Sequence, residues 1–186
     1  VTTGMRLGEL LVLRWQDIDL SGARLVVRVQ LVWLGNRPIL TEPKTAKGRR
    51  PIDLPPLAVE ALRQRRKQQA QERLLAGPAW RDEWGLAFTT AIGTPIRPAN
   101  LRRWSFKPLL ARAGLPPIRF HDLRHTHASL LLAAGTHPKL VQEQLGHSTV
   151  TLTLDTYSHV LPSLRRQVAA TMQQLLAPPQ DGAGLQ

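Results

Sequence analysis

Four short stretches of the chain carry side chains that can bind or attack a phosphate group. Arg6 lies in an expected helix, and His121 and Arg124 are three apart, so that a helix would present both on one face. His147 follows a glycine at an expected junction between two helices, and Tyr157 is the only tyrosine of the chain. Arginine offers planar, permanently charged donors that suit phosphate oxygens, and a phenol oxygen can act as a nucleophile.

Taken singly, these residues have ordinary structural explanations. Arg6 and Glu9, three apart, can form a surface ion pair, which contributes little to stability. Tyr157 can be a half-buried packing aromatic whose hydroxyl is bound to the backbone. The order and spacing of all four stretches, rather than any one of them, favour chemistry on a phosphate.

A small antiparallel sheet and one short helix are expected to position the first of these residues. Residues 2–15 are predicted to form a helix with its leucines on one face. The β-branched run over residues 25–32 predicts a strand, and further strands are expected around 39–41 and 50–54. The loop over residues 43–49, between the last two strands, is predicted to be a hairpin with a basic tip.

Most of the remaining chain is predicted to be helical. The expected helices cover residues 56–76, 98–113, 121–135, 138–145, 149–157 and 163–176. The tail over residues 178–186 has a composition typical of disorder. The predicted fold class is therefore mainly α with a small antiparallel β-sheet (α+β). Because the first helix begins almost at residue 1, we expect a fragment whose upstream part is missing.

The composition favours a polyanionic partner. Lys and Arg number 25 against 13 Asp and Glu, which gives a formal net charge of +12 and a pI of about 11.5. Such a surplus suits phosphate neutralisation, although a GC-rich genome can also produce a basic surface. The absence of cysteine excludes disulfides and Cys-based zinc sites. No apolar run approaches the ~20 residues of a membrane span, and no signal peptide is recognised, so a cytoplasmic protein is expected.

The four stretches together resemble a known family. TGMRLGELLVLRWQDID is followed in order by PKTAKGRRPIDLP, FHDLRHTHASLLLAAG and LGHSTVTLTLDTYSHV. These strings, over residues 4–160, resemble the catalytic domain of tyrosine recombinases of the phage-integrase type. The resemblance implies site-specific DNA recombination and integration by strand cleavage and rejoining, carried out by a catalytic domain over residues 1–177.

The resemblance also assigns six catalytic residues, of which none departs from the family's pattern. They are two arginines, the hairpin lysine, two histidines and the nucleophile: Arg6, Arg124, Lys44, His121, His147 and Tyr157. The arginines would clamp the non-bridging phosphate oxygens, and Glu9 would orient Arg6 without reacting. Because cationic side chains fill the electrostatic role, no metal or other cofactor is required.

The remaining roles follow from the chemistry of a phosphodiester. Tyr157 would attack phosphorus and hold the DNA as a 3′-phosphotyrosine. A phenol has an ordinary pKa of about 10, so it needs a base, for which His121 is the candidate. His147 would donate a hydrogen bond to the phosphate. Lys44 would protonate the leaving 5′ oxygen, and Lys47 is its competitor for that role.

Three alternatives remain. His121 and His125 have the i, i+4 spacing of a zinc-peptidase helix, but Asp122 replaces the expected glutamate, and Arg124 would place a cation beside the metal. Type IB topoisomerases share the phosphotyrosine chemistry, but the LDTYSHV ending favours the integrase branch. The chain can also be a truncated, catalytically inactive DNA-binding remnant of an integrase.

The resemblance further implies partners. They are double-stranded DNA and three further copies of the chain, in a homotetramer on synapsed duplexes, with no membrane and no small-molecule substrate. The protein is expected in the cytoplasm, with the nucleoid, and a mobile element is one expected origin. The helix after Tyr157 has an apolar stripe of Leu164, Val168, Met172 and Leu175, which docks on a neighbouring protomer or packs in cis.

Overall fold

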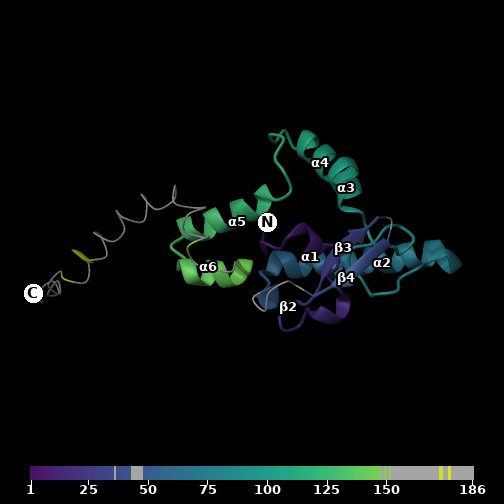
Figure 1. The fold of residues 1–186 in the computed structure, drawn as a ribbon, viewed down its shortest axis with the longest axis horizontal. Coiled ribbons are helices and arrows are strands. Elements are labelled where there is room, and N and C mark those ends of the chain that lie inside the picture. Colours follow the sequence, from purple (N-terminus) through teal and green to yellow (C-terminus); the bar gives the residue numbers. More distant parts are fainter. Residues whose placement is uncertain are drawn as a thin grey trace, which may run out of the picture.

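The computed structural model describes residues 1–35, 37–42, 48–147, 149, 151, 172, 173 and 176. Its helices and strands, in chain order, are α1 (Leu7–Leu10), β1 (Ile18–Asp19), β2 (Arg24–Val27), β3 (Gln30–Leu34), β4 (Arg37–Thr41), β5 (Arg50–Asp53), α2 (Pro56–Ala76), α3 (Pro98–Asn100), α4 (Lys107–Arg112), α5 (Asp122–Ala133) and α6 (Pro138–Leu145). Figure 1 shows α5 and α6 side by side, next to the body formed by the strands and α2. Among the described residues, none of the helices has the length and apolar character that crossing a bilayer requires.

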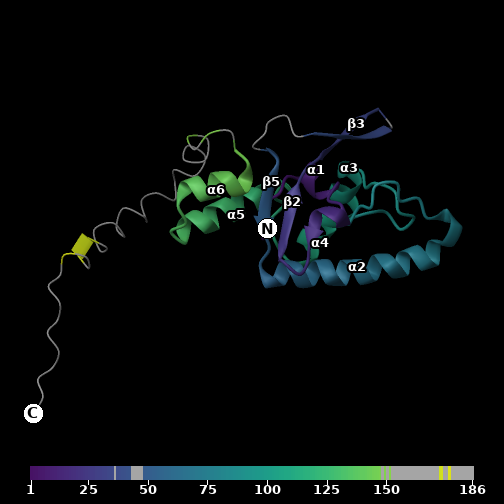
Figure 2. The same ribbon diagram turned by 90° about the horizontal axis from the view of Figure 1, so that it is seen from below.

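The strands form two small antiparallel sheets. One has the order β1-β2-β5, with Leu25 opposite Ile52, and the other is the hairpin of β3 and β4, with Trp33 opposite Pro38. Figure 2 shows β3 on the side of the body opposite to α2. The predicted fold class is confirmed, with two sheets in place of the single sheet expected.

Two predictions about the strands are wrong. The run over residues 25–32 is not one strand, because the chain leaves β2 after Val27 and enters β3 at Gln30, in the other sheet. Nor do the strands that flank residues 43–49 form a hairpin, since β4 pairs with β3 while β5 pairs with β2. That segment therefore connects the two sheets. Strand order depends on contacts distant in sequence, which local patterns do not reveal.

The first predicted helix is also much shorter than expected. Residues 2–15 contain only α1, which has four residues. Leu11, Val12 and Leu13 are all buried, and three consecutive side chains cannot share one face of a helix. Instead the chain pairs with a distant segment, and the Ala87 amide donates to the Leu13 carbonyl at 2.7 Å.

The other helices agree closely with the sequence pattern. The prediction for α6 is confirmed to the residue. The helix predicted to open at Pro55-Pro56 and to end near Ala76 is confirmed as α2, and α5 differs from its prediction only at its ends. The helix expected over residues 98–113 runs from α3 to α4, with a π-helical stretch over Leu101–Phe106. The helices predicted over 149–157 and 163–176, and the tail over 178–186, lie outside the described residues except for a few isolated positions.

The described residues form two hydrophobic clusters. The first joins the three-stranded sheet to α2 and contains Met5, Leu13, Leu25, Val27, Ile52, Leu54, Val59 and Leu62. The second lies between α5 and α6 and contains Ala128, Leu132, Val141 and Leu145. Met5, just before α1, belongs to the first cluster, and its neighbour Gly4 lies close to Leu145 of the second.

Gly4→Ala is expected to lower the free energy of unfolding by about 3 kcal/mol, from left-handed strain and overpacking together. Gly4 has φ +60°, and a Cβ there would lie 2.6 Å from His127 Cδ2 and 2.8 Å from Leu145 Cδ2. Gly35→Ala is the matched control, because Gly35 has φ +59° with nothing within 4 Å of the added carbon. Urea unfolding of both variants separates the two effects. Equal decreases in the free energy of unfolding of the two variants would show that the close contact of the added carbon at Gly4 costs nothing.

Candidate active site

Four of the six predicted catalytic residues lie in the described part of the chain, and the structure brings them to one place. Arg6 is the N-cap of α1, His121 is the N-cap of α5, and Arg124 lies in the first turn of α5. His147 comes directly after Gly146, the left-handed residue that ends α6. Lys44 and Tyr157 fall outside the described residues. The catalytic role of all six residues stays a prediction.

Arg124 is buried and bound at both ends of its guanidinium. Its exposed fraction is 3%. Nη1 donates to the Gly4 carbonyl and Nη2 to the Leu145 carbonyl, each at 2.6 Å. A buried charge is costly unless hydrogen bonds satisfy it, and these two supply that compensation. Arg124 thereby connects the segment before α1 to the end of α6.

Arg6 is more accessible, with 41% of its side chain exposed. Nη1 donates to Glu9 Oε1 at 2.9 Å, and the Arg6 backbone amide donates to Glu9 Oε2 at 2.8 Å. Nη2 reaches the Gly146 carbonyl at 3.3 Å. The expected contact between Glu9 and Arg6 is therefore present, and the guanidinium keeps an open side for a ligand.

Arg50, which no motif of the sequence indicated, lies as centrally in the site as the predicted residues. Its guanidinium is 5% exposed, and it donates to both carboxylate oxygens of Glu9, at 3.1 and 2.9 Å. Burial alone would raise the pKa of Glu9, but the hydrogen bonds and charges of Arg50 and Arg6 hold it below its ordinary value. One signal was available: in β5 Arg50 shares the inward face with buried Ile52, and Leu54 continues that alternation.

The end of α6 gathers the three arginines. Consecutive backbone carbonyls accept one hydrogen bond from each guanidinium, and the pairs are Gln144 with Arg50, Leu145 with Arg124, and Gly146 with Arg6. The last carbonyls of a helix lack intrahelical donors and carry its partial negative charge. They are therefore suitable acceptors for three cations that would otherwise repel one another.

Both predicted imidazoles are held neutral by their surroundings. Burial, followed by the charges of Arg124, Arg6 and Arg50, lowers the pKa of His147 to about 4. Burial, followed by the charges of His125 and Arg124, also lowers the pKa of His121. At neutral pH His121 can therefore accept a proton, and His147 can donate a hydrogen bond from its ring N–H.

His147 predicts a specific dependence of stability on pH. Because its folded pKa lies below the ordinary value of 6.5, the unfolded chain binds more protons between pH 6.5 and about 4. The contribution of His147 to stability is thus fully present above pH 6.5 and is lost as the pH falls toward 4. Urea unfolding across this range should show a smaller pH slope in His147→Gln than in the wild type. His137→Gln, which removes an exposed imidazole outside the site, is the control, and equal slopes in all three proteins would contradict the prediction.

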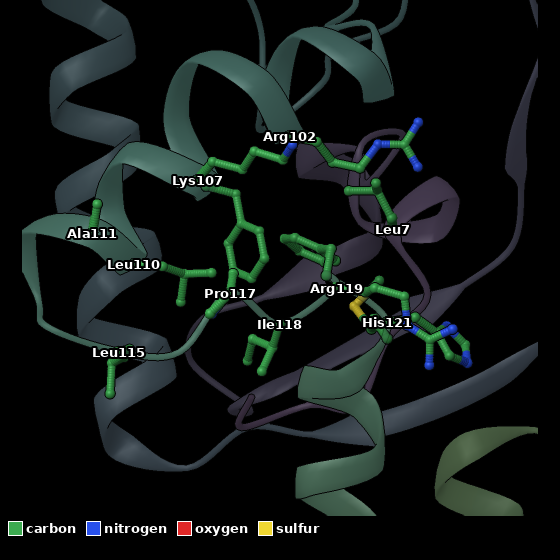
Figure 3. A pocket seen from close by; sticks show the side chains of 13 residues that line it. Leu7, Arg102, Lys107, Leu110, Ala111, Leu115, Pro117, Ile118, Arg119 and His121 are labelled. Carbon is green, nitrogen blue, oxygen red and sulfur yellow. The ribbon is translucent and has the colours of Figure 1, made fainter.

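A cavity of about 810 Å³ lies beside His121 and is lined mainly by apolar side chains. Figure 3 shows Leu7, Arg119 and His121 on one side of it and Ala111 and Leu115 on the other. Among the described residues, no three histidine, aspartate or glutamate side chains converge as a metal site would require. The rings of the two histidines of the expected zinc motif, His121 and His125, pack edge to face with their centroids 4.8 Å apart.

Solved structures share this fold. The Tn1549 transposon integrase, in complex with transposon right end DNA, has a TM-score of 0.74 and 26% identity, and the match covers 95% of this chain and 56% of that one. The XerA recombinase has a TM-score of 0.64 at 23% identity, over 95% of this chain and 54% of that one, which shows the fold alone. The fold is that of the catalytic domains of tyrosine recombinases.

Sequence relatives lead to the same group. The chain is 37% identical to a XerC-like tyrosine recombinase of Caldanaerobacter subterraneus, over 93% of this chain and 47% of the relative. It is 32% identical to the ICEBs1 integrase of Bacillus subtilis, over 94% of this chain and 46% of the relative. The chain thus spans about half the length of these relatives. It matches the phage integrase family over residues 1–163 and belongs to that family, as the resemblance predicted.

Proposed function

We propose that this chain is the catalytic part of a site-specific recombinase that cleaves and rejoins double-stranded DNA through a 3′-phosphotyrosine at Tyr157. The observation that carries the proposal is the convergence of Arg6 and Arg124 on the end of α6, beside two neutral imidazoles. Family membership and the names of the relatives, which are recombinases and integrases, support it. The charge of +12 suits a DNA substrate.

The described residues supply most of the groups for such a reaction. The Tyr157 oxygen attacks phosphorus as the bond from phosphorus to the 5′ oxygen breaks. The phenol proton passes to neutral His121, and Lys44 gives a proton to the 5′ oxygen. Arg6, with its exposed guanidinium, binds a non-bridging oxygen, while Arg124 adds charge from a buried position where the field is weakly screened. Reversal of the same steps rejoins the strand.

The assembly that we propose goes beyond this chain. Four protomers would bind two synapsed duplexes, and the protein would work in the cytoplasm on nucleoid DNA, as part of a mobile element. Residues 1–177 would act as one catalytic unit followed by a tail. Phosphate contacts dominate such binding, so affinity should fall steeply as salt rises. A flat response to salt would contradict DNA as the substrate.

The experiment is to trap the covalent intermediate. The chain is incubated with a pool of nicked, random-sequence duplexes, from which the cut fragment can diffuse away, and denaturation-resistant adducts are isolated. Peptide mapping should locate the nucleotide on Tyr157. No adduct from this chain, but one after an upstream domain is added, would mean that the chain is an incomplete enzyme. DNA binding without an adduct in either form would support the alternative, an inactive DNA-binding remnant.

A further inference from the structure

Arg50 binds the same glutamate as Arg6, and it does so from a buried position. It lies on β5, and its guanidinium is buried behind Glu9. Nε donates to the Gln144 carbonyl at 2.7 Å, while Nη1 and Nη2 bind the two oxygens of Glu9. A further contact joins Nη1 to the carbonyl of Gly48, two residues before β5 begins, at 3.2 Å. These four hydrogen bonds from the Arg50 guanidinium reach three separate segments of the chain.

Both groups that bind the Arg6 guanidinium are held in place by the contacts of Arg50. The Arg6 guanidinium binds only Glu9 and the Gly146 carbonyl among the hydrogen bonds described. Arg50 fixes the first partner directly, because it binds both oxygens of the Glu9 carboxylate. It fixes the second through the Gln144 carbonyl, two residues before Gly146 in the same helix end.

Arg50 also balances a charge that would oppose phosphate binding. Glu9 is a buried carboxylate 2.9 Å from the Arg6 guanidinium, so on its own it would cancel the charge of Arg6. The ion pair with Arg50, also at 2.9 Å, compensates Glu9 from its other side. Arg6, Glu9 and Arg50 together therefore carry one net positive charge. Of the three side chains, that of Arg6 is the exposed one.

We propose that Arg50 is a positioning residue for the strand-cleavage reaction. It holds Glu9 and the end of α6 so that the Arg6 guanidinium stays aimed at the scissile phosphate with its charge uncompensated. This inference rests on the proposed function. It assigns to Arg50 no contact with substrate, and it predicts that loss of Arg50 slows cleavage while DNA binding is retained.

The chain contains a matched control for the substitution. Arg65 of α2 binds both oxygens of Glu72, at 2.7 and 2.8 Å, and its Nε donates to the Ala87 carbonyl at 2.9 Å. Like Arg50, Arg65 binds a carboxylate through both Nη atoms and a backbone carbonyl through Nε, but Arg65 makes no contact with Glu9 or Arg6 among the hydrogen bonds described. Arg50→Lys and Arg65→Lys each keep the charge and remove the planar fork, since lysine is a point charge that cannot bind in a bidentate manner.

The first measurement is the single-turnover rate of adduct formation in the full chain, with DNA affinity measured on the same duplexes. We expect Arg50→Lys to lower the rate about 10²-fold, since a misplaced catalytic group costs about that much, with unchanged affinity and salt dependence. Arg65→Lys should cleave at the wild-type rate below its melting temperature. Wild-type cleavage by Arg50→Lys, or loss of DNA affinity in place of rate, would overturn the inference.

The second measurement does not depend on activity. The ¹⁵N order parameter of the Arg6 Nε–H reports how firmly that guanidinium is held. We expect a rigid Arg6 in the wild type and in Arg65→Lys, and a value below about 0.6 in Arg50→Lys. An equally rigid Arg6 in all three proteins would refute positioning by Arg50. If the wild type forms no adduct even after an upstream domain is added, the proposed function fails, and the order parameter still decides whether Arg50 positions Arg6.

A second variant covers the case in which Arg50→Lys does not fold. The double substitution Glu9→Gln with Arg50→Gln leaves no unpaired buried charge, because both ions of the pair are removed together. Arg6 then loses its fixed carboxylate, and its order parameter should fall as in Arg50→Lys. A rigid Arg6 in this variant would equally overturn the inference.

Discussion

Tyr157→Phe is expected to abolish the covalent adduct while DNA binding stays at the wild-type level. The substitution removes one oxygen atom, and the phosphotyrosine bond requires that oxygen. Since the chain has no second tyrosine, no neighbouring phenol can replace it. The measurement is adduct formation on nicked duplexes, together with a binding isotherm on the same DNA.

The DNA binding of Tyr157→Phe shows whether loss of the adduct reflects the missing oxygen or a misfolded protein. Loss of the adduct together with loss of DNA binding would suggest a folding defect, which a thermal melt of the variant identifies. An adduct that persists in Tyr157→Phe would show that another side chain is the nucleophile, and the mechanism proposed above would then be wrong. Peptide mapping of such an adduct would identify the true site.

Arg124→Lys is expected to lower the cleavage rate by about 10²-fold, because lysine keeps the charge but loses the contacts that fix its position, and a misplaced catalytic group costs about that much. It should also lower the free energy of unfolding by about 1–3 kcal/mol, because one ammonium cannot serve both carbonyls that Arg124 binds and a buried acceptor is left unsatisfied. Those carbonyls belong to Gly4 and Leu145. Both effects therefore come from the same two contacts.

Two assays test Arg124→Lys. Single-turnover cleavage gives the rate, and urea unfolding gives the stability. Arg63→Lys, at an exposed position of α2, is the control for an arginine-to-lysine change outside the site. A stable Arg124→Lys protein that cleaves like the wild type would remove Arg124 from the catalytic residues. A destabilised Arg124→Lys protein with a normal cleavage rate would show that Arg124 stabilises the fold and takes no part in cleavage.

The sequence predicted the helices well because their signals are local. Pro56 and Pro138 stand in the first turns of α2 and α6, and Gly146 ends α6 in the left-handed conformation. The first helix was overestimated because Leu11 to Leu13 look like part of an apolar helical face, whereas all three are buried. The strand pairing depends on contacts between distant residues, so the two sheets could not be separated from the pattern alone.

The sequence indicated four residues that the structure brings together, Arg6, His121, Arg124 and His147, but it did not indicate the contacts that hold them. The spacing of Arg6 and Glu9 on one helical turn correctly indicated their contact. Nothing local indicates that Arg124 is buried or that the end of α6 accepts hydrogen bonds from three arginines. Arg50 was overlooked because an arginine in a basic segment looks like a surface residue, although the alternation with Ile52 and Leu54 indicated an inward position.

The contacts at the end of α6 join residues that are very far apart along the chain. Arg124 binds Gly4 across 120 residues, and Arg6 binds Gly146 across 140. Closing loops of that length is entropically costly, and contacts of such sequence separation form late in folding. During synthesis the cationic cluster can assemble only after residue 146 has left the ribosome. A partly made chain therefore lacks the cluster of three arginines, which can form only once nearly all the described residues have been synthesised.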